Sequence, residues 1–146
     1  ADYGVVADVW SVTSWGELRR EGLEKDERKF LDPFGEHEPT WVEQKLAGTA
    51  GPVVAVSDYM RAVPDQIRQW VPRDYMTLGA DGFGFSDTRA AARRYFHIDG
   101  PSVAVAVLQR LAAAGEVPAE WATEAAAKYR LGDVTAGSSG NAGGDA

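Results

Sequence analysis

Three short apolar runs alternate along this chain with stretches in which apolar residues recur every three or four positions, as in a helix. The runs are rich in β-branched and aromatic residues, which favour buried strands, and they cover residues 5–12, 53–56 and 75–79. Strands that alternate with helices predict an α/β fold, here a three-layer α/β/α sandwich with a mostly parallel mixed sheet.

The first run leads into a predicted helix. Thr13 or Ser14 can cap it, and Glu17 follows Ser14 by three residues, as in a capping box. We expect this helix to reach Gly22 or slightly beyond. Residues 24–40 are charged and rich in turn formers, so they are expected to form a surface loop.

Helices are predicted before and after the second apolar run, at residues 53–56. Residues 41–46 predict a short helix or turn. Ser57 or Asp58 is expected to cap a longer helix whose apolar positions extend to Val71. Pro64 lies inside that pattern and predicts a kink or a new helix start.

Three further helices are predicted, over residues 88–98, 102–114 and 118–131. Gly115 and Gly132 can end the last two. Residues 136–146 are rich in Gly, Ser and Ala and predict a disordered tail, so the folded domain is assigned to residues 1–135.

The number of strands is small for a parallel sheet, which must be covered on both faces. The chain also passes from Ala1 almost directly into an apolar run. We therefore expect the first strand and helix of the domain to precede residue 1.

Composition narrows the function classes. The chain has 146 residues, enough for one domain with a core, and 45% of them are apolar. The net charge of −7 opposes binding to nucleic acid or to an anionic membrane surface, and no run approaches the ~18 apolar residues of a membrane helix. The absence of cysteine excludes disulfides and thiolate chemistry, and it is compatible with the cytoplasmic location that we expect.

A glycine turn, Asp-Gly-Phe-Gly-Phe-Ser-Asp-Thr-Arg at residues 81–89, lies between the third strand and a helix start. Open α/β sheets place ligand and partner contacts at such turns. A phosphate site is disfavoured because Asp87 occupies the third glycine position of the fingerprint and Asp81 would also repel a phosphate. Ser86 or Asp87 is instead expected to cap the following helix.

Acidic side chains and histidines give no clear catalytic set. Asp58, Asp81 and Asp87 could form a carboxylate cluster for a metal or for acid–base work, but each also precedes a helical run that it could cap. His37 lies in a charged segment, and His97 lies near a helix end, where it can hydrogen-bond or favour the helix dipole. We therefore expect no catalytic, cofactor-binding or metal-binding residue here.

Aromatic and basic residues make the glycine turn a candidate interface. Phe83 and Phe85 are unusual in a bare loop, and interface cores favour aromatic residues. Arg89 and Arg93 lie one helical turn apart, beside Arg94, and could bind an acidic partner or form a solvated basic face. The candidate interface residues are Asp81, Phe83, Phe85, Asp87, Arg89 and Arg93.

Three motifs taken together resemble one family. They are Val-Trp-Ser-Val-Thr-Ser at residues 9–14, Ser-Asp-Tyr-Met-Arg at residues 57–61 and the glycine turn. The family is the homodimeric thiamine-diphosphate pyruvate dehydrogenase, the first component of the pyruvate dehydrogenase complex. The resemblance is to its carboxy-terminal domain and covers residues 5–115 in the same order.

This resemblance implies a fold like the transketolase C-terminal domain, with a five-stranded mixed sheet. It implies a parent enzyme that oxidatively decarboxylates pyruvate and acetylates a lipoyl group, with thiamine diphosphate and Mg bound by upstream domains. The implied partners are those upstream domains, the second subunit of a homodimer and the lipoyl acyltransferase. The implied role of this chain is structural and dimerising, and alone it is expected to be inactive.

Two departures from the family pattern keep alternatives open. Phe85 stands where the family usually has arginine, and residues 30–38 carry Asp32-Pro33 instead of a His-Pro pattern. One alternative is the same domain of a paralogue that acts on another 2-oxo acid or a ketose. The other is a non-enzymatic protein-interaction module.

Overall fold

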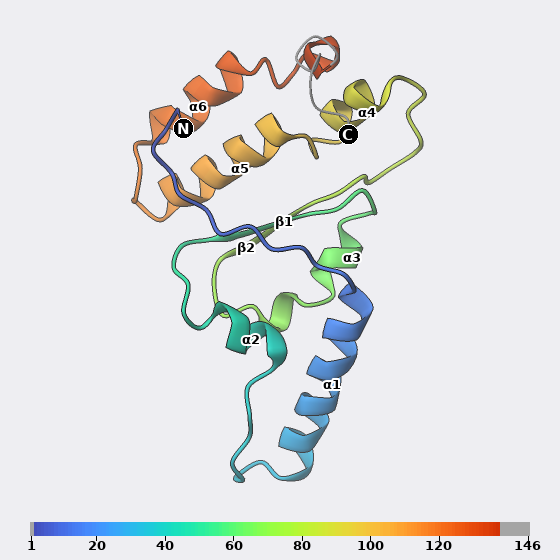
Figure 1. The fold of residues 1–146 in the computed structure, drawn as a ribbon, viewed down its shortest axis with the longest axis vertical. Helices are drawn as coiled ribbons and strands as arrows, with labels where there is room; N and C mark the ends of the chain where they lie inside the picture. The colour runs from blue at the N-terminus through green and yellow to red at the C-terminus, as the bar shows by residue number, and fades with distance from the viewer. Residues whose placement is uncertain (1, 138–146) are drawn as a thin grey trace.

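Two parallel strands lie between two groups of helices (Figure 1). The structure, a computed structural model, describes residues 2–137. β1 (Val53–Val56) pairs in parallel with β2 (Tyr75–Leu78), so that Val53 lies opposite Tyr75 and Val56 opposite Leu78. The remaining elements are α1 (Trp15–Leu31), α2 (Trp41–Leu46), α3 (Ala62–Asp65), η1 (Arg68–Trp70), α4 (Arg89–Tyr95), α5 (Gly100–Ala113), α6 (Ala119–Lys128) and η2 (Val134–Gly137).

The helices form a layer on each side of the strands, as the α/β prediction required. In Figure 1, α5 and α6 lie above the strands, and α1, α2 and α3 lie below them. The lower core contains Val42 of α2, Trp70 and Tyr75, with Val53 and Ala55 of β1 packed against it. The upper core joins α5 to α6 through three buried residues, Val105, Leu108 and Ala125.

α1 is longer than predicted. Ser14 caps it as expected, and its Oγ accepts a hydrogen bond from the Glu17 backbone nitrogen at 3.2 Å. The expected loop at residues 24–40 is wrong for residues 24–31, which continue the helix. These residues are mostly Glu, Lys and Arg, which are good helix formers, and Arg20 forms ion pairs with Glu17 (2.5 Å) and Glu24 (2.6 Å) along the helix.

The predicted helix after β1 is broken into two short ones. Ser57 does not cap a helix, since its Oγ accepts a hydrogen bond from the Tyr59 backbone at 3.1 Å, and α3 begins only after Arg61. Pro64 lies within α3, which ends at Asp65, and η1 begins at Arg68. Side-chain bonds to β2, described below, hold this irregular path, which local helix propensity could not reveal.

The C-terminal helices agree closely with their sequence pattern. Asp99 caps α5, which therefore begins slightly earlier than predicted. Gly115 ends the segment with φ +76°, a conformation that glycine adopts readily. α6 ends before the predicted stop, Gly132, because Arg130 already adopts φ +51°.

The apolar segment at residues 5–12 is not a strand, so that prediction is wrong. Val6 is 94% and Val9 is 93% exposed, and within the segment only its first residue, Val5, packs against the upper core, together with the preceding Tyr3. Within residues 2–137, the sheet has two strands and none of its pairing involves this segment. β-Branched residues form a strand only where a partner strand accepts their backbone bonds. The preceding strand and helix stay a prediction. Residues 136 and 137 of the predicted tail form the end of η2, and residues 138–146 lie outside the described residues.

Gly22 allows α1 to lie directly against the lower core. A Cβ on Gly22 would lie 2.5 Å from the ring of Trp70, which is 4% exposed and donates its indole N–H to Asp26 of the same helix at 3.0 Å. That hydrogen bond and the surrounding core leave the ring little freedom to move away.

We expect Gly22→Ala to lower the free energy of unfolding by about 1–2 kcal/mol, because overpacking against Trp70 outweighs the better helix propensity of alanine. Urea unfolding would measure the change. Gly16→Ala is the matched control, since the nearest atom to its added Cβ, Ser14 Oγ, is 4.0 Å away in the same helix. Equal stability changes in the two variants would contradict the prediction.

Candidate interface at the carboxyl end of the sheet

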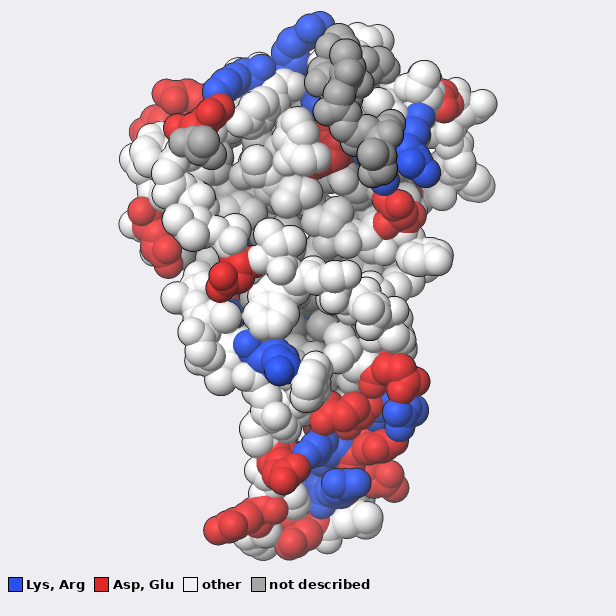
Figure 2. Space-filling view, viewed as in Figure 1, with Lys and Arg blue, Asp and Glu red and all other residues white. Residues whose placement is uncertain are grey.

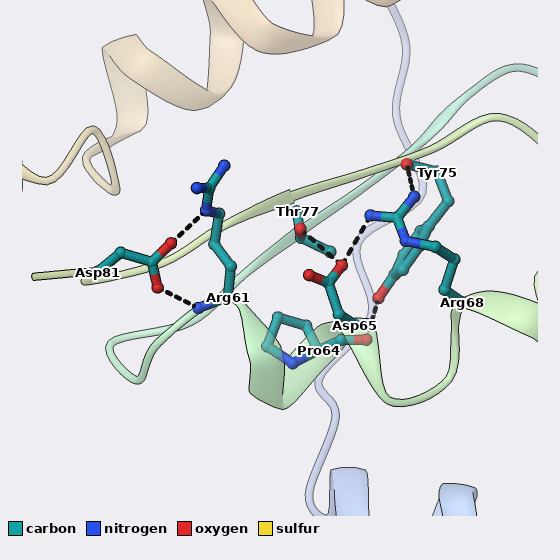
Figure 3. Close-up of polar contacts among 7 residues, drawn as sticks. All are labelled: Arg61, Pro64, Asp65, Arg68, Tyr75, Thr77 and Asp81. Atoms are coloured by element: carbon teal, nitrogen blue, oxygen red, sulfur yellow. Dashed lines mark hydrogen bonds and ion pairs between the residues drawn. The ribbon is translucent and has the colours of Figure 1, made fainter.

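The loops that follow the two strands meet at one edge of the sheet. Parallel strands end at the same edge, so residues 57–61 after β1 lie beside residues 79–88 after β2. The Ala80 backbone nitrogen donates to the Tyr59 carbonyl at 2.9 Å. Asp81 accepts hydrogen bonds from the Arg61 backbone nitrogen, at 2.8 Å, and from the Arg61 guanidinium (Figure 3).

Gly79 is required for this approach of the two loops. A Cβ at this position would lie 2.6 Å from the Tyr59 carbonyl oxygen and 2.7 Å from the Arg61 nitrogen. Both neighbours are backbone atoms, so neither can rotate away as a side chain would. No pattern in the sequence distinguishes Gly79 from Gly82 and Gly84 in the turn that follows it.

A second set of polar contacts supports the loop after β1 (Figure 3). Asp65 accepts hydrogen bonds from Thr77 at 2.9 Å and from Arg68 at 2.7 Å. Arg68 also donates to the Tyr75 carbonyl at 2.8 Å, and the Tyr75 hydroxyl donates to the Pro64 carbonyl at 2.8 Å. Burial raises the pKa of Tyr75 well above its usual range, so this hydroxyl remains a donor. These contacts join α3 and η1 to β2.

The acidic residues do not form the carboxylate cluster considered from the sequence. Asp81 is bound by Arg61, whose hydrogen bonds hold the pKa of that carboxyl below its usual value. Asp58 faces Arg93 at 3.7 Å. Within residues 2–137, no three His, Asp or Glu side chains gather in a way that could hold a metal ion.

The expected capping roles of the acidic residues are also corrected. Asp81 bonds the neighbouring loop and caps no helix. α4 is capped by Thr88, whose side chain accepts from the Ala91 nitrogen at 3.2 Å, and not by Ser86 or Asp87. Asp87 supports the cap from one residue upstream, since it accepts a hydrogen bond from the Thr88 nitrogen at 2.7 Å.

The two aromatic residues of the glycine turn have different surroundings. Phe83 is 96% exposed. Phe85 is half-buried and stacks on Tyr95 of α4, with ring centroids 4.4 Å apart and planes within 4° of parallel. Tyr95 also meets Phe96 edge to face, at a centroid distance of 5.0 Å. Phe85 is therefore part of the local packing, and Phe83 is a free apolar side chain.

The three arginines of α4 do not form one basic face. Arg89 is exposed and Arg93 is half-buried, but Arg94 is buried and its Nε donates to Asp99 at 2.6 Å. The sequence interpretation that grouped Arg94 with the other two is therefore wrong. Arg94 lies about 100° around α4 from Arg93, on the side that faces the C-terminal helices.

A shallow depression of about 360 Å³ lies beside the turn. Its lining includes Arg61, Gly79, Asp81, Tyr95 and His97. His97 is exposed and adopts φ +56° just after α4, as a helix-ending residue does. Asp81 and Arg61, which also line the depression, are paired with each other.

The remaining histidine has a local role. His37 Nε2 lies 2.6 Å from the Asp32 carbonyl oxygen in the turn after α1. Neither histidine approaches a serine or a carboxylate within the hydrogen bonds of the described residues, so the chemistry of a nucleophile activated by a base is not assembled there. The arrangement is suited to association through aromatic and paired charged side chains.

We expect Gly79→Ala to lower the free energy of unfolding by about 1–3 kcal/mol, because its Cβ would force the two loops apart. Chemical denaturation of the purified variant would measure this. Gly84→Ala in the same turn is the control: no atom lies within 4 Å of its added Cβ, so the variant should retain or slightly gain stability. A silent Gly79→Ala would mean that the loops are not held at this distance.

Comparison with known proteins agrees with this architecture. Residues 1–99 match the model of the transketolase-like TK C-terminal domain. The chain is 59% identical over 136 residues to the pyruvate dehydrogenase E1 component of Mycolicibacterium smegmatis, and 54% identical over 136 residues to that of Mycobacterium tuberculosis; each match covers 93% of this chain. It is 40% identical over 131 residues, 89% of the chain, to the Escherichia coli K12 protein of the same name.

The chain spans about 15% of the length of these relatives. The predicted resemblance is confirmed at the level of the domain, and the helices with a small parallel sheet agree with the α/β prediction. The chain belongs to the transketolase-like TK C-terminal domain family.

Proposed function

We propose that this chain is the carboxy-terminal structural and dimerisation domain of a pyruvate dehydrogenase E1 component. The observation that carries the proposal is the identity of 40–59% to proteins of that name, spread over 89–93% of the chain. The parent enzyme would oxidatively decarboxylate pyruvate with thiamine diphosphate and pass the acetyl group to a lipoyl group. The domain would cover residues 1–135, followed by a tail.

The side chains at the carboxyl edge of the sheet support a role without direct catalysis. A thiamine-diphosphate site needs oxygen ligands for Mg²⁺ and groups that bind a diphosphate. Here the exposed carboxylates of Asp58 and Asp81 face arginines, and Asp87 lies on the cap of α4. This donor set does not fit the cofactor, so we propose that the parent binds thiamine diphosphate and Mg²⁺ through its upstream domains.

Exposed apolar side chains support packing against other parts of a larger assembly. Val6, Val9 and Trp10 are exposed in the N-terminal segment, and Phe83 projects from the glycine turn. Acidic and basic side chains gather over α1 at the lower end of the molecule, whereas the middle of the same face is largely uncharged (Figure 2). Large apolar side chains exposed on an uncharged part of the surface are suited to contact with another protein surface.

The proposed partners are the upstream domains, the second subunit of a homodimer and the lipoyl acyltransferase. Nucleic acid is not a proposed partner, because the net charge is −7. Among residues 2–137, none of the helices has the length and apolar character that a membrane span requires. The proposed location is the cytoplasm.

A paralogue that acts on another 2-oxo acid or a ketose is the second candidate. The observation that favours it is the residue at position 85. The resemblance leads us to expect an arginine there, but the chain has Phe85, which stacks on Tyr95. Assays of the full-length enzyme with pyruvate and with longer 2-oxo acids would separate the two candidates. A clear preference for a longer acid would select the paralogue.

We expect the isolated chain to show no saturable binding of thiamine diphosphate with Mg²⁺, because the residues suited to the cofactor lie in the proposed upstream domains. Isothermal titration calorimetry of the 146-residue chain, beside the full-length protein, would test this. Micromolar binding by the isolated chain would contradict the proposed division of roles.

We expect Phe83→Ser to weaken assembly of the full-length enzyme, since an exposed aromatic residue that becomes buried at an interface contributes about 1–2 kcal/mol or more. In the isolated chain the same change should alter stability by less than about 0.5 kcal/mol, because the ring is free there. Thermal unfolding of both forms would compare the effects. An unchanged full-length protein would remove Phe83 from the interface.

A further inference from the structure

From a buried position, Arg94 connects α4 to residues at the ends of two other helices. The residue is 3% exposed. Its Nε donates to Asp99 Oδ2 at 2.6 Å, just before α5. Its Nη1 donates to the carbonyls of Tyr129 at 2.7 Å and Arg130 at 3.2 Å, at the end of α6. One guanidinium therefore joins α4 to the start of one helix and to the end of another.

Both helix ends gain from this position. The carbonyls of Tyr129 and Arg130 directly follow α6, where a positive charge favours the helix dipole. The Tyr129 carbonyl, at the C-cap, has no donor within the helix, whereas the Arg130 carbonyl also accepts from the Asp133 nitrogen at 2.9 Å. Asp99 uses Oδ1 to accept from the Ser102 nitrogen at 3.1 Å, and so caps α5 while Oδ2 accepts from Arg94. Burial raises the pKa of Asp99, but the hydrogen bonds from Ser102 and Arg94 outweigh it and hold the pKa below its usual value.

η2 packs against the same part of α4. A Cβ on Gly137 would lie 2.8 Å from the Ala90 carbonyl oxygen and 2.8 Å from Arg94 Cβ. Only a residue without a side chain allows η2 to lie this close to α4, so η2 adds a further packing contact to the bonds that Arg94 makes with the ends of α5 and α6. All of these partners lie in sequence at or beyond the end of the family match at residue 99.

The residue after Arg94 carries the connection to the glycine turn. Tyr95 stacks on Phe85 at 4.4 Å, whereas the turn is otherwise exposed at residues 81–84 and 86–89. The position of Phe85 therefore depends on where α4 holds Tyr95. The opposite end of the turn is held separately, by the bonds between Asp81 and Arg61.

We propose that Arg94 is a positioning residue that couples the C-terminal helices to the glycine turn, by fixing α4 so that Tyr95 holds Phe85 in place. Detachment of α4 from the start of α5 and the end of α6 is thereby transmitted to the turn, which Arg94 itself does not contact. The proposal rests on the proposed function only in treating the turn as an interface. The coupling itself is a property of this chain.

Lysine cannot replace arginine in this role. Three acceptors lie around the guanidinium in different directions, and the flat fork of arginine donates to all of them from fixed positions. An ammonium group is a point charge on a flexible stem and would satisfy part of this set. Arg94→Lys therefore removes the geometry while it keeps the charge.

Hydrogen exchange followed by mass spectrometry on the 146-residue chain tests the coupling. In Arg94→Lys we expect amides of residues 80–88 to exchange about tenfold faster or more, together with those of residues 124–131. Arg93→Lys, at the half-buried neighbour that faces Asp58, is the matched control and should leave the turn unchanged. Tyr95→Leu should accelerate exchange in the turn while residues 124–131 stay protected.

Leu108→Ala distinguishes the proposed coupling from a general loss of stability. This variant opens the buried core between α5 and α6 and leaves the bonds of Arg94 in place. At equal global stability, Arg94→Lys should expose the turn more than Leu108→Ala does. If Arg94→Lys does not fold, Asp99→Asn gives the weaker form of the same test. A turn that exchanges alike in the Arg94 and Leu108 variants, or in the Arg94 and Arg93 variants, would overturn the proposal.

Discussion

The pairing of two short parallel strands is the constraint on which the rest of this structure depends. A parallel pair must be covered on both faces, and its two carboxyl ends must lie side by side. α1 and α2 supply one cover through Trp70 and its neighbours, and α5 with α6 supplies the other. The same pairing brings the loops after β1 and β2 into backbone contact, which only a residue without a side chain, Gly79, permits.

Arginines determine how the loops and helices around the strands are held. Arg61 joins the two loops through Asp81, and Arg68 joins η1 to β2. Arg94 joins α4 to the C-terminal helices. The first two lie at the surface, where ion pairs contribute little energy and act mainly by fixing geometry. Arg94 is buried, so loss of its geometry would leave polar groups unpaired and cost more.

A domain of this kind can contribute to an enzyme without contacting its substrate. The carboxylates at the sheet edge face arginines or support a cap, and the aromatic residues of the turn divide into one that packs locally and one that remains free. Free aromatic side chains beside paired charges are suited to a contact with another protein surface. The proposed place at the carboxy terminus of a larger dehydrogenase is consistent with such a surface.

The sequence alone determined the local elements: the Ser14 cap, β1 and β2, and the stop at Gly115 follow from side-chain chemistry within a few residues. Residues 5–12 have strand propensity but no partner strand within the described chain. Residues 24–31 are highly charged, which suggested a surface loop, but they continue α1. At the candidate interface, the pattern identified the turn and its exposed Phe83, but not the burial of Arg94 or the need for Gly79. Those features depend on carbonyls and backbone atoms tens of residues away, and only the tertiary structure brings them within reach.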